Sequence, residues 1–139
     1  MYKHILLASD GSENAVRAAK EAVKLASYNQ EAVIDVVYVV DIEKSKYDVL
    51  HSNSKEAADL ARRKKNSKVL QFLNEANVTY KTTILRGEPG PEIVKYANEQ
   101  GVDIVVIGSR GLNALQEMVL GSVSHKVMKR VNCPALIVK

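Results

Sequence analysis

The chain has 139 residues, enough for one domain and too few for two of ordinary size, so we expect one domain over residues 1–139. Hydrophobic residues make up 46% of the chain, which is typical of a globular domain with a core. No apolar run approaches the ~20 residues that a membrane-spanning helix needs, so we expect no membrane partner.

The first residues and the cysteine content favour a cytoplasmic protein. Residues 1–7 (MYKHILL) enter a strand-like stretch that soon reaches Ser9-Asp10-Gly11. They lack the long apolar segment and the small-residue cleavage site of a signal peptide. The single cysteine, Cys133, cannot form an internal disulfide, which fits a reducing compartment. We interpret Cys133, which precedes Pro134, as a packed small residue.

The formal net charge is only +4, and much of it comes from Arg62-Arg63-Lys64-Lys65 with Lys68 nearby. A basic patch of this kind can bind nucleic acid or an acidic partner. No aromatic residues interleave with these charges, however, as a single-strand binder would require. We therefore interpret the run as a solvated helix face and expect no nucleic-acid partner.

The first half of the chain alternates between strand and helix patterns. Lys3–Ser9 is an apolar run of strand length, and Ser12 can cap a helix after it. Ala32–Val40 is rich in β-branched residues and predicts a buried strand. Asp41–Asn53 is polar with weak periodicity, which indicates a loop. The small residues on one stripe of the first helix, which allow close packing on a sheet, are Ala15, Ala18, Ala19, Ala22 and Ala26.

The second half repeats this alternation. Ser54 begins a long helix whose apolar stripe Lys65 interrupts, and Val78–Leu85 is a less apolar strand, expected near a sheet edge. A turn at residues 87–91 leads to a helix with Pro91 in its first position and Gly101 at its end. Three segments follow: a strand over residues 102–107, a long connection with a helix-like stripe, and a helix capped by Ser122. A last strand is expected over residues 134–138. The positions expected to face inward are Ala58, Ala61, Val69, Phe72, Leu73, Ala76, Ile93, Val94, Ala97, Leu112, Leu115, Met118, Val123, Val127, Met128 and Val131.

Five strands alternating with helices predict a single-domain α/β fold, an open, five-stranded, Rossmann-like parallel sheet with helices on both faces. In such sheets ligands bind beyond the carboxyl ends of the strands, where the strand order reverses. Two loops at such ends carry polar and glycine residues. The first runs from Ala8 to Ser12, and the second connects residues 108–111 with residues 121–124.

The second loop has the composition of a phosphate site. Gly108 and Gly111 lack a Cβ, so backbone N–H groups can approach a phosphate closely, and Gly121 does the same just before a helix. Ser122 and Ser124 add hydroxyl and N–H groups at the helix N-terminus, where the helix dipole favours an anion. The glycines could simply make turns, but the whole set at strand–helix junctions favours phosphate binding.

Asp10 follows the first strand. A carboxylate facing a triphosphate would repel it, so Asp10 is better placed to accept hydrogen bonds from ribose hydroxyls or to hold Mg²⁺. The alternative is an Asp that only shapes the turn beside Gly11.

Three segments resemble the universal stress protein family. Residues 5–13 (ILLASDGSE) are similar to its opening, and residues 132–138 (NCPALIV) look like its last strand. The spacing G-x2-G-x9-G-S at residues 108–122 resembles the ATP-binding signature of its nucleotide-binding branch. The resemblance covers essentially the whole chain and breaks down mainly across Asp41–Asn53. Ala8 stands where the family often has Pro, and Arg110 where it often has His; neither removes the glycine frame.

The resemblance implies a strand order of 3-2-1-4-5, in which both loops flank one cleft. It implies ATP or another adenine nucleotide, with Mg²⁺ carried on the phosphates. Asp10 would contact the ribose, and backbone near Val39 would contact adenine. It also implies a homodimer through Ala135–Val138, an apolar strand that would be a liability if left unpaired at an edge. The positions assigned to the nucleotide site are Ala8, Ser9, Asp10, Val39, Gly108, Ser109, Arg110, Gly111, Gly121, Ser122, Val123 and Ser124.

The leading hypothesis is a stress-response module that holds ATP and signals the bound state to a partner protein. A slow ATPase or self-phosphorylating protein stays open, because Ser122, Ser124 and Arg110 lie near the expected phosphates. The sequence, however, lacks the lysine of the P-loop, which places positive charge on the β- and γ-phosphates in P-loop nucleoside triphosphatases. A dimeric interaction protein with an empty cleft also stays open. His125 is interpreted as a solvated helix residue, His4 and His51 have no visible partner, and no cluster has metal-ligand spacing.

Overall fold

A computed structural model describes residues 1–41, 55–110 and 120–139, with the backbone alone at residues 55–63 and 65. Within these residues the chain forms one five-stranded parallel sheet in the order β3-β2-β1-β4-β5. The predicted α/β class and strand order are therefore confirmed. The strands are β1 (His4–Ala8), β2 (Val33–Val40), β3 (Tyr80–Arg86), β4 (Ile104–Gly108) and β5 (Ala135–Val138).

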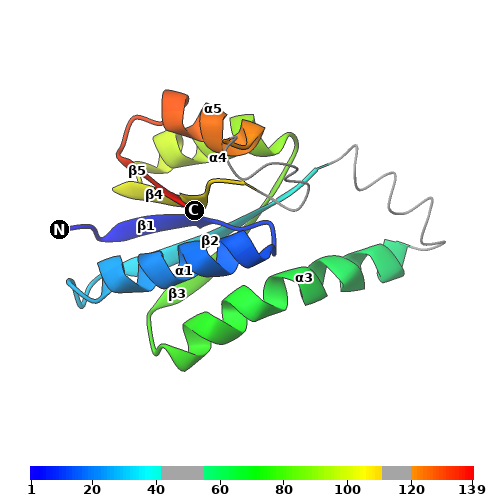
Figure 1. Cartoon of the computed structure of the whole chain (residues 1–139), viewed down its shortest axis with the longest axis horizontal. Coiled ribbons are helices and arrows are strands. Elements are labelled where there is room, and N and C mark those ends of the chain that lie inside the picture. The colour runs from blue at the N-terminus through cyan, green and yellow to red at the C-terminus, as the bar shows by residue number, and fades with distance from the viewer. Residues whose placement is uncertain (42–54, 111–119) are drawn as a thin grey trace.

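The helices cover both faces of the sheet: α1 (Glu13–Ala26) and α3 (Lys55–Glu75) lie on one face, and α4 (Pro89–Gln100) and α5 (Ser122–Arg130) on the other (Figure 1). The alanine stripe of α1 is buried against β1, β2 and β4, because side chains this small let the helix backbone approach the strands. On the opposite face, Ile93 and Ala97 of α4 and Val127 of α5 pack on the strands. Both faces are thus apolar, as a central parallel sheet requires.

Most predicted elements agree with the structure to within one or two residues. Ser12 is the N-cap of α1, since its hydroxyl accepts a hydrogen bond from the backbone N–H of Ala15. Gly101 ends α4 in the left-handed conformation at φ 61°. As expected, β3 lies at an edge of the sheet, and Val69 and Leu73 of α3 are buried.

Three details of the helices differ from expectation. α4 begins at Pro89, so Pro89 rather than Pro91 takes its first position. Either proline is tolerated in a first turn, where its missing N–H would have had no helical partner. The N-cap of α5 is Gly121 rather than Ser122, because the backbone is still extended at Gly121 (ψ 153°). Met128 is 47% exposed, since it follows the buried Val127 by a rotation of about 100° around the helix.

Several predictions fall on residues outside the described parts of the chain. These are the loop over Asp41–Asn53 beyond its first residue, which includes His51, and the positions Ser54, Gly111, Leu112, Leu115 and Met118. At Ala58, Ala61 and Lys65 of α3 only the backbone is described, so the predicted orientation of these side chains lies outside the described structure as well.

Candidate functional site

The carboxyl ends of β1 and β4 lie side by side. β1 pairs with β4 in parallel register, Leu6 opposite Val105 and Leu7 opposite Val106. The chain continues from β1 toward α1 on one side of the sheet and from β4 toward α5 on the other (Figure 1). This is the point where the strand order reverses, and the two predicted loops begin next to each other there.

Side chains and backbone fix the shape of the loop after β1. The backbone N–H of Ser9 donates to Val37 O at 3.0 Å, so the chain stays beside β2 beyond the end of the strand. The Ser9 hydroxyl donates to Asn66 Oδ1 of α3 at 2.7 Å. Asp10 Oδ1 accepts from the backbone N–H of Ser12 at 2.9 Å. Asp10 therefore shapes the turn that starts α1, and its contact with ribose stays a prediction.

The described ends of the loop between β4 and α5 close on each other. The backbone N–H of Ser109 donates to Val138 O of β5 at 2.7 Å, and the N–H of Gly121 donates to Ser109 O at 2.7 Å. The buried hydroxyl of Ser124 donates to Gly108 O. Two sequence positions that are 12 residues apart, Ser109 and Gly121, are thereby held in contact.

Two glycines at this junction lie against other groups at the place where a side chain would begin. A Cβ on Gly121 would lie 3.3 Å from both Arg110 Cα and Ser109 O, tighter than most real contacts. A Cβ on Gly108 would lie 2.3 Å from Asn14 Oδ1, which is a clash. A Cβ at Gly108 would therefore displace Asn14, and a Cβ at Gly121 would push the neighbouring backbone by a few tenths of an ångström.

The N-terminus of α5 adds a partial positive charge to this junction. The first-turn N–H groups of Ser122, Val123 and Ser124 have no acceptor within the helix. The first turn contains no acidic residue, and the helix dipole is positive at this end. The Ser124 hydroxyl is already engaged with Gly108, so the donors that this end can offer are the backbone N–H groups and the exposed Ser122 hydroxyl. Such a junction is suited to an anionic ligand, and phosphate is the usual one.

Asn14 is a site residue that the sequence reasoning missed. It lies in the first turn of α1 and is 4% exposed. Its Oδ1 accepts from the backbone N–H of Arg110 at 2.9 Å, and its Nδ2 donates to Val138 O at 3.2 Å. A local signal existed, because Asn14 is four residues before Ala18 and therefore lies on the buried stripe of its helix.

The remaining predicted positions lie around the same end of the sheet. Ala8 is buried at the end of β1, and Val39, near the end of β2, packs partly buried on the face that α4 and α5 cover. Arg110, the last described residue after β4, is partly exposed. The roles of Val39 toward adenine and of Arg110 toward phosphate stay predictions.

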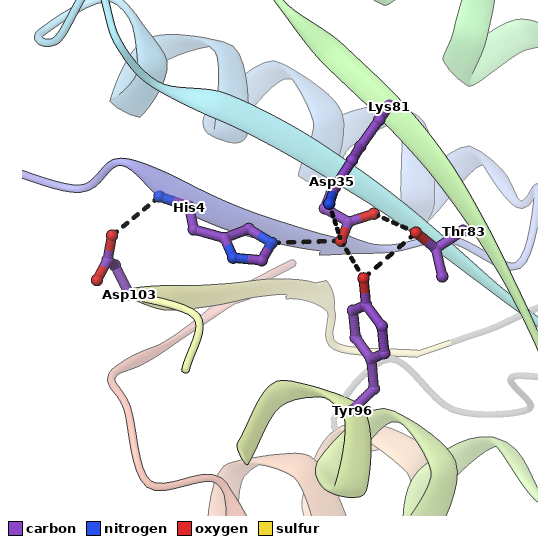
Figure 2. Close-up of polar contacts among 6 residues, drawn as sticks. All are labelled: His4, Asp35, Lys81, Thr83, Tyr96 and Asp103. Carbon is purple, nitrogen blue, oxygen red and sulfur yellow. Dashed lines mark hydrogen bonds and ion pairs between the residues drawn. The ribbon is translucent and has the colours of Figure 1, made fainter. Parts of the chain in front are cut away.

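At the opposite, amino end of the sheet, a buried carboxylate joins three strands to α4 (Figure 2). Asp35 of β2 is fully buried; Thr83 donates to its Oδ1 at 2.7 Å and the Tyr96 hydroxyl donates to its Oδ2 at 2.6 Å. His4 Nε2 lies 3.2 Å and Lys81 Nζ 3.8 Å from Oδ2. Burial raises the pKa of Tyr96, and the hydrogen bond to Asp35 adds to the rise, so the phenol stays a donor at neutral pH.

The interpretation of His4 as a residue without a partner was therefore wrong. Its ring contacts Asp35, and its backbone N–H donates to Asp103 Oδ2 at 2.9 Å, as does the N–H of Lys3. These two backbone hydrogen bonds lower the pKa of Asp103. Each residue drawn in Figure 2 thus makes a polar contact with a residue of another element or loop.

Other functional groups are sparse in the part of the chain that the structure describes. There, no three His, Cys, Asp or Glu side chains are positioned to hold a metal ion. None of the helices within residues 1–41, 55–110 and 120–139 is long and apolar enough to cross a membrane. Cys133 is partly buried, and this burial raises the pKa of its thiol. The reactive thiolate form is therefore less populated at neutral pH.

Comparison with known proteins identifies a family. Residues 1–139 match the profile of the Universal stress protein family. The universal stress protein YxiE of Bacillus subtilis is 35% identical over 149 residues, which cover all of this chain and all of the relative. The structure of the universal stress protein UspA from Lactobacillus plantarum is 27% identical, with a TM-score of 0.82 and coverage of 99% of this chain and 98% of that one.

Some structures with this fold are described as nucleotide complexes. The universal stress protein of Archaeoglobus fulgidus in complex with dAMP is 21% identical, with a TM-score of 0.74 over 99% of this chain and 98% of that one. A universal stress family protein of Arabidopsis thaliana with AMP bound is 20% identical, with a TM-score of 0.67 over 99% and 91%. At this identity the likeness establishes a common fold.

Proposed function

This chain belongs to the universal stress protein family, and from that premise we propose that it binds ATP or another adenine nucleotide beyond the carboxyl ends of β1 and β4. The phosphates would lie against the junction of Ser109, Gly121 and the first turn of α5. The ribose would lie on the side of Asp10, and the adenine on the side of Val39.

The observation that carries this proposal is the close approach at Gly121. Its missing side chain lets the N-terminus of α5 come within contact of the backbone at Ser109 and Arg110. The backbone N–H groups of the first turn of α5 are thereby presented beside the loop that follows β4, and that turn contains no acidic side chain. A polyanion is the ligand that such donors stabilise.

Two further points support the choice of nucleotide. Proteins of the same fold hold dAMP and AMP, so the shared architecture accommodates an adenine nucleotide. Mg²⁺ would arrive on the phosphates and supply a counter-charge there, because this hard cation keeps much of its water and binds phosphate oxygens readily. Within the proposed site, this chain's own contribution is to bind and orient the phosphates.

The proposed role is a signalling module in the cytoplasm, in which the bound state is passed to a partner protein. β5 is an edge strand of four apolar, partly buried residues, and an unpaired edge of this kind invites pairing with a second chain. We include a homodimer through Ala135–Val138 in the proposal for that reason. An occupied and an empty cleft would then present different dimers to the partner.

The decisive experiment is calorimetric titration of nucleotide-stripped protein with ATP, AMP and cyclic AMP in the presence of Mg²⁺. We expect micromolar binding by the wild type. Gly121→Val should weaken it by about 100-fold or more, equal to about 2.8 kcal/mol, because the branched side chain would separate α5 from Ser109. Saturating nucleotide at about 100 times its dissociation constant should also stabilise the wild type by about 2.7 kcal/mol.

Gly101→Asn is the matched control. Gly101 lies at the other end of the sheet, no atom lies within 4 Å of its Cβ position, and asparagine tolerates its left-handed backbone. Its affinity should stay within about twofold of the wild type, since it touches no part of the cleft. A folded wild type that binds none of the three nucleotides would refute the proposal and leave a dimeric protein with an empty cleft.

A further inference from the structure

Asn14 connects two parts of the molecule that are distant in sequence. Its side-chain amide accepts from the backbone N–H of Arg110 at 2.9 Å and donates to the carbonyl of Val138 at 3.2 Å. Arg110 belongs to the loop after β4, and Val138 is the last residue of the edge strand β5. One buried amide group therefore contacts both the loop after β4, called the phosphate loop below for its described residues Ser109 and Arg110, and the last residue of the edge strand β5.

The end of β5 depends on these contacts. The Val138 carbonyl accepts a second hydrogen bond, from the backbone N–H of Ser109 at 2.7 Å. Arg17 Nε, one turn further along α1, donates to Lys139 O at 3.0 Å. The first turns of α1 and the first residues of the phosphate loop thus hold the last two residues of the chain in place.

The arrangement constrains the residue types at two positions. An apolar residue in place of Asn14 would leave the Arg110 N–H without its partner, and a buried unsatisfied donor is costly. The Asn14 side chain also fills the space where Gly108 would carry a Cβ, 2.3 Å from Asn14 Oδ1. The amide therefore has one available place, and its position depends on the backbone at Arg110 and Val138 together.

We propose that Asn14 couples the backbone at Ser109 and Arg110 to the C-terminal edge strand, so that a nucleotide bound beside these two residues also orders the end of β5. The inference rests on the proposed function and adds its regulation. A phosphate held by the loop fixes the backbone at Arg110, which fixes the Asn14 amide, which holds the Val138 carbonyl. The coupling is reciprocal: pairing of β5 with a second chain would tighten nucleotide binding by the same factor.

Hydrogen–deuterium exchange read by mass spectrometry tests this coupling, with β3, the other edge strand, as an internal standard. Saturating Mg·ATP would stabilise the whole domain, and that effect alone slows the exchange that occurs through global unfolding at both edges alike. The coupling predicts an additional slowing confined to peptides that cover β5, of about 5-fold or more relative to β3. The wild type alone provides this measurement, so it does not depend on a variant that folds.

Asn14→Asp identifies the residue responsible. The carboxylate still accepts from Arg110 N, but it cannot donate to Val138 O. Asn98→Asp is the matched control, because Asn98 makes the same pair of contacts elsewhere: its Nδ2 donates to Arg130 O at 3.2 Å and its Oδ1 accepts from Asn132 N at 2.9 Å. At saturating nucleotide, the additional slowing at β5 should disappear in Asn14→Asp and persist in Asn98→Asp.

Equal slowing of β5 and β3 in a wild type that binds nucleotide would overturn the coupling and leave the proposed function intact. Persistence of the additional slowing in Asn14→Asp would overturn the role of Asn14. Calorimetry that detects no nucleotide binding would remove the proposed function and the coupling with it. The proposal is supported if nucleotide slows exchange at β5 more than at β3, and if this extra slowing requires the hydrogen bond from Asn14 to Val138 O.

Discussion

At the amino ends of the strands, a buried carboxylate is hydrogen-bonded by other side chains. At the carboxyl ends, buried side chains instead make hydrogen bonds with backbone groups. Asp35 contacts the side chains of Thr83, Tyr96 and His4, which come from two strands and a helix (Figure 2). Asn14 and Ser124 instead contact the backbone of Arg110, Val138 and Gly108. The first arrangement joins side chains of regular elements to one another, and the second joins the backbone of β4, of β5 and of Arg110 just after β4.

This difference separates stability from binding. Changes at the amino end should lower the free energy of unfolding and leave nucleotide affinity nearly unchanged, since the two ends share no contacts among these residues. Changes at the carboxyl end should affect both. The predictions below test that separation, beginning with the largest expected effect.

Asp35→Ala should have the largest effect on folding. The substitution removes the acceptor for the Thr83 and Tyr96 hydroxyls and leaves a cavity, so we expect a loss of about 3 kcal/mol in the free energy of unfolding. Urea denaturation measures this loss. Asp35→Asn, which keeps one acceptor oxygen, should lose about half as much. A nucleotide affinity that fell with stability in either variant would contradict the separation of the two ends.

Gly108→Ala should affect both quantities. The new Cβ would lie 2.3 Å from Asn14 Oδ1, so Asn14 must leave Arg110, and we expect a loss of about 2 kcal/mol in stability with at least tenfold weaker nucleotide binding. Gly101→Ala is the control, because the left-handed backbone there costs about 1 kcal/mol without any contact to the cleft. Weaker binding in both variants would mean that affinity merely follows stability.

Tyr96→Phe should cost about 1.5 kcal/mol, because it removes the closest donor to the buried Asp35. The raised pKa of Tyr96 favours the neutral phenol in the folded state. Its contribution is therefore complete below pH 10, the ordinary value, and is lost as pH rises through the folded-state pKa. The matched variant is Tyr80→Phe, whose hydroxyl donates to Asn74 at the surface. Chemical denaturation at pH 7 and pH 9 should show a clear loss for Tyr96→Phe alone.

Asp103→Asn should have the smallest effect, about 0.5 kcal/mol at neutral pH, because solvent screens this exposed carboxylate. The hydrogen bonds from His4 N and Lys3 N lower the pKa of Asp103, so its stabilising contribution is present above its ordinary value of 3.8. The contribution is lost as pH falls through the folded-state pKa. Urea denaturation from pH 7 to pH 3 should therefore show the wild type and the variant converging in acid. A constant difference would exclude the carboxylate charge as the cause.

The fold could be predicted from the sequence because its signals are local. The alanine stripe of α1 and the β-branched run of β2 each fit one element, and their alternation implies a parallel sheet. The predicted start of α4 and the predicted N-cap of α5 were off by two residues and one residue, since several residues near each helix start suit those positions. Met128 was expected inward because its neighbour Val127 is.

The polar contacts between elements could not be predicted in the same way. Asp35 interrupts an apolar strand, but its partners come from β1, β3 and α4, and nothing in the local sequence identifies them. His4 was set aside for that reason. Asn14 is separated from its two partners by 96 and 124 positions. The glycine spacing could be recognised because its residues are close in sequence, whereas Asn14, which contacts the backbone at Arg110, lies on a different element.

The position of β1 between β2 and β4 has a consequence for synthesis. The backbone N–H of His4 finds its partner, Asp103, 99 residues later in the chain. At the ribosome's rate of about 5–20 residues per second, the first strand waits roughly 5–20 seconds for the second of its neighbours. β2 reaches it early, so a nascent half-sheet of β1, β2 and β3 can form while the cleft still lacks one wall. Both loops exist only once residues 121–124 have been made, so nucleotide binding must follow the synthesis of the first turn of α5.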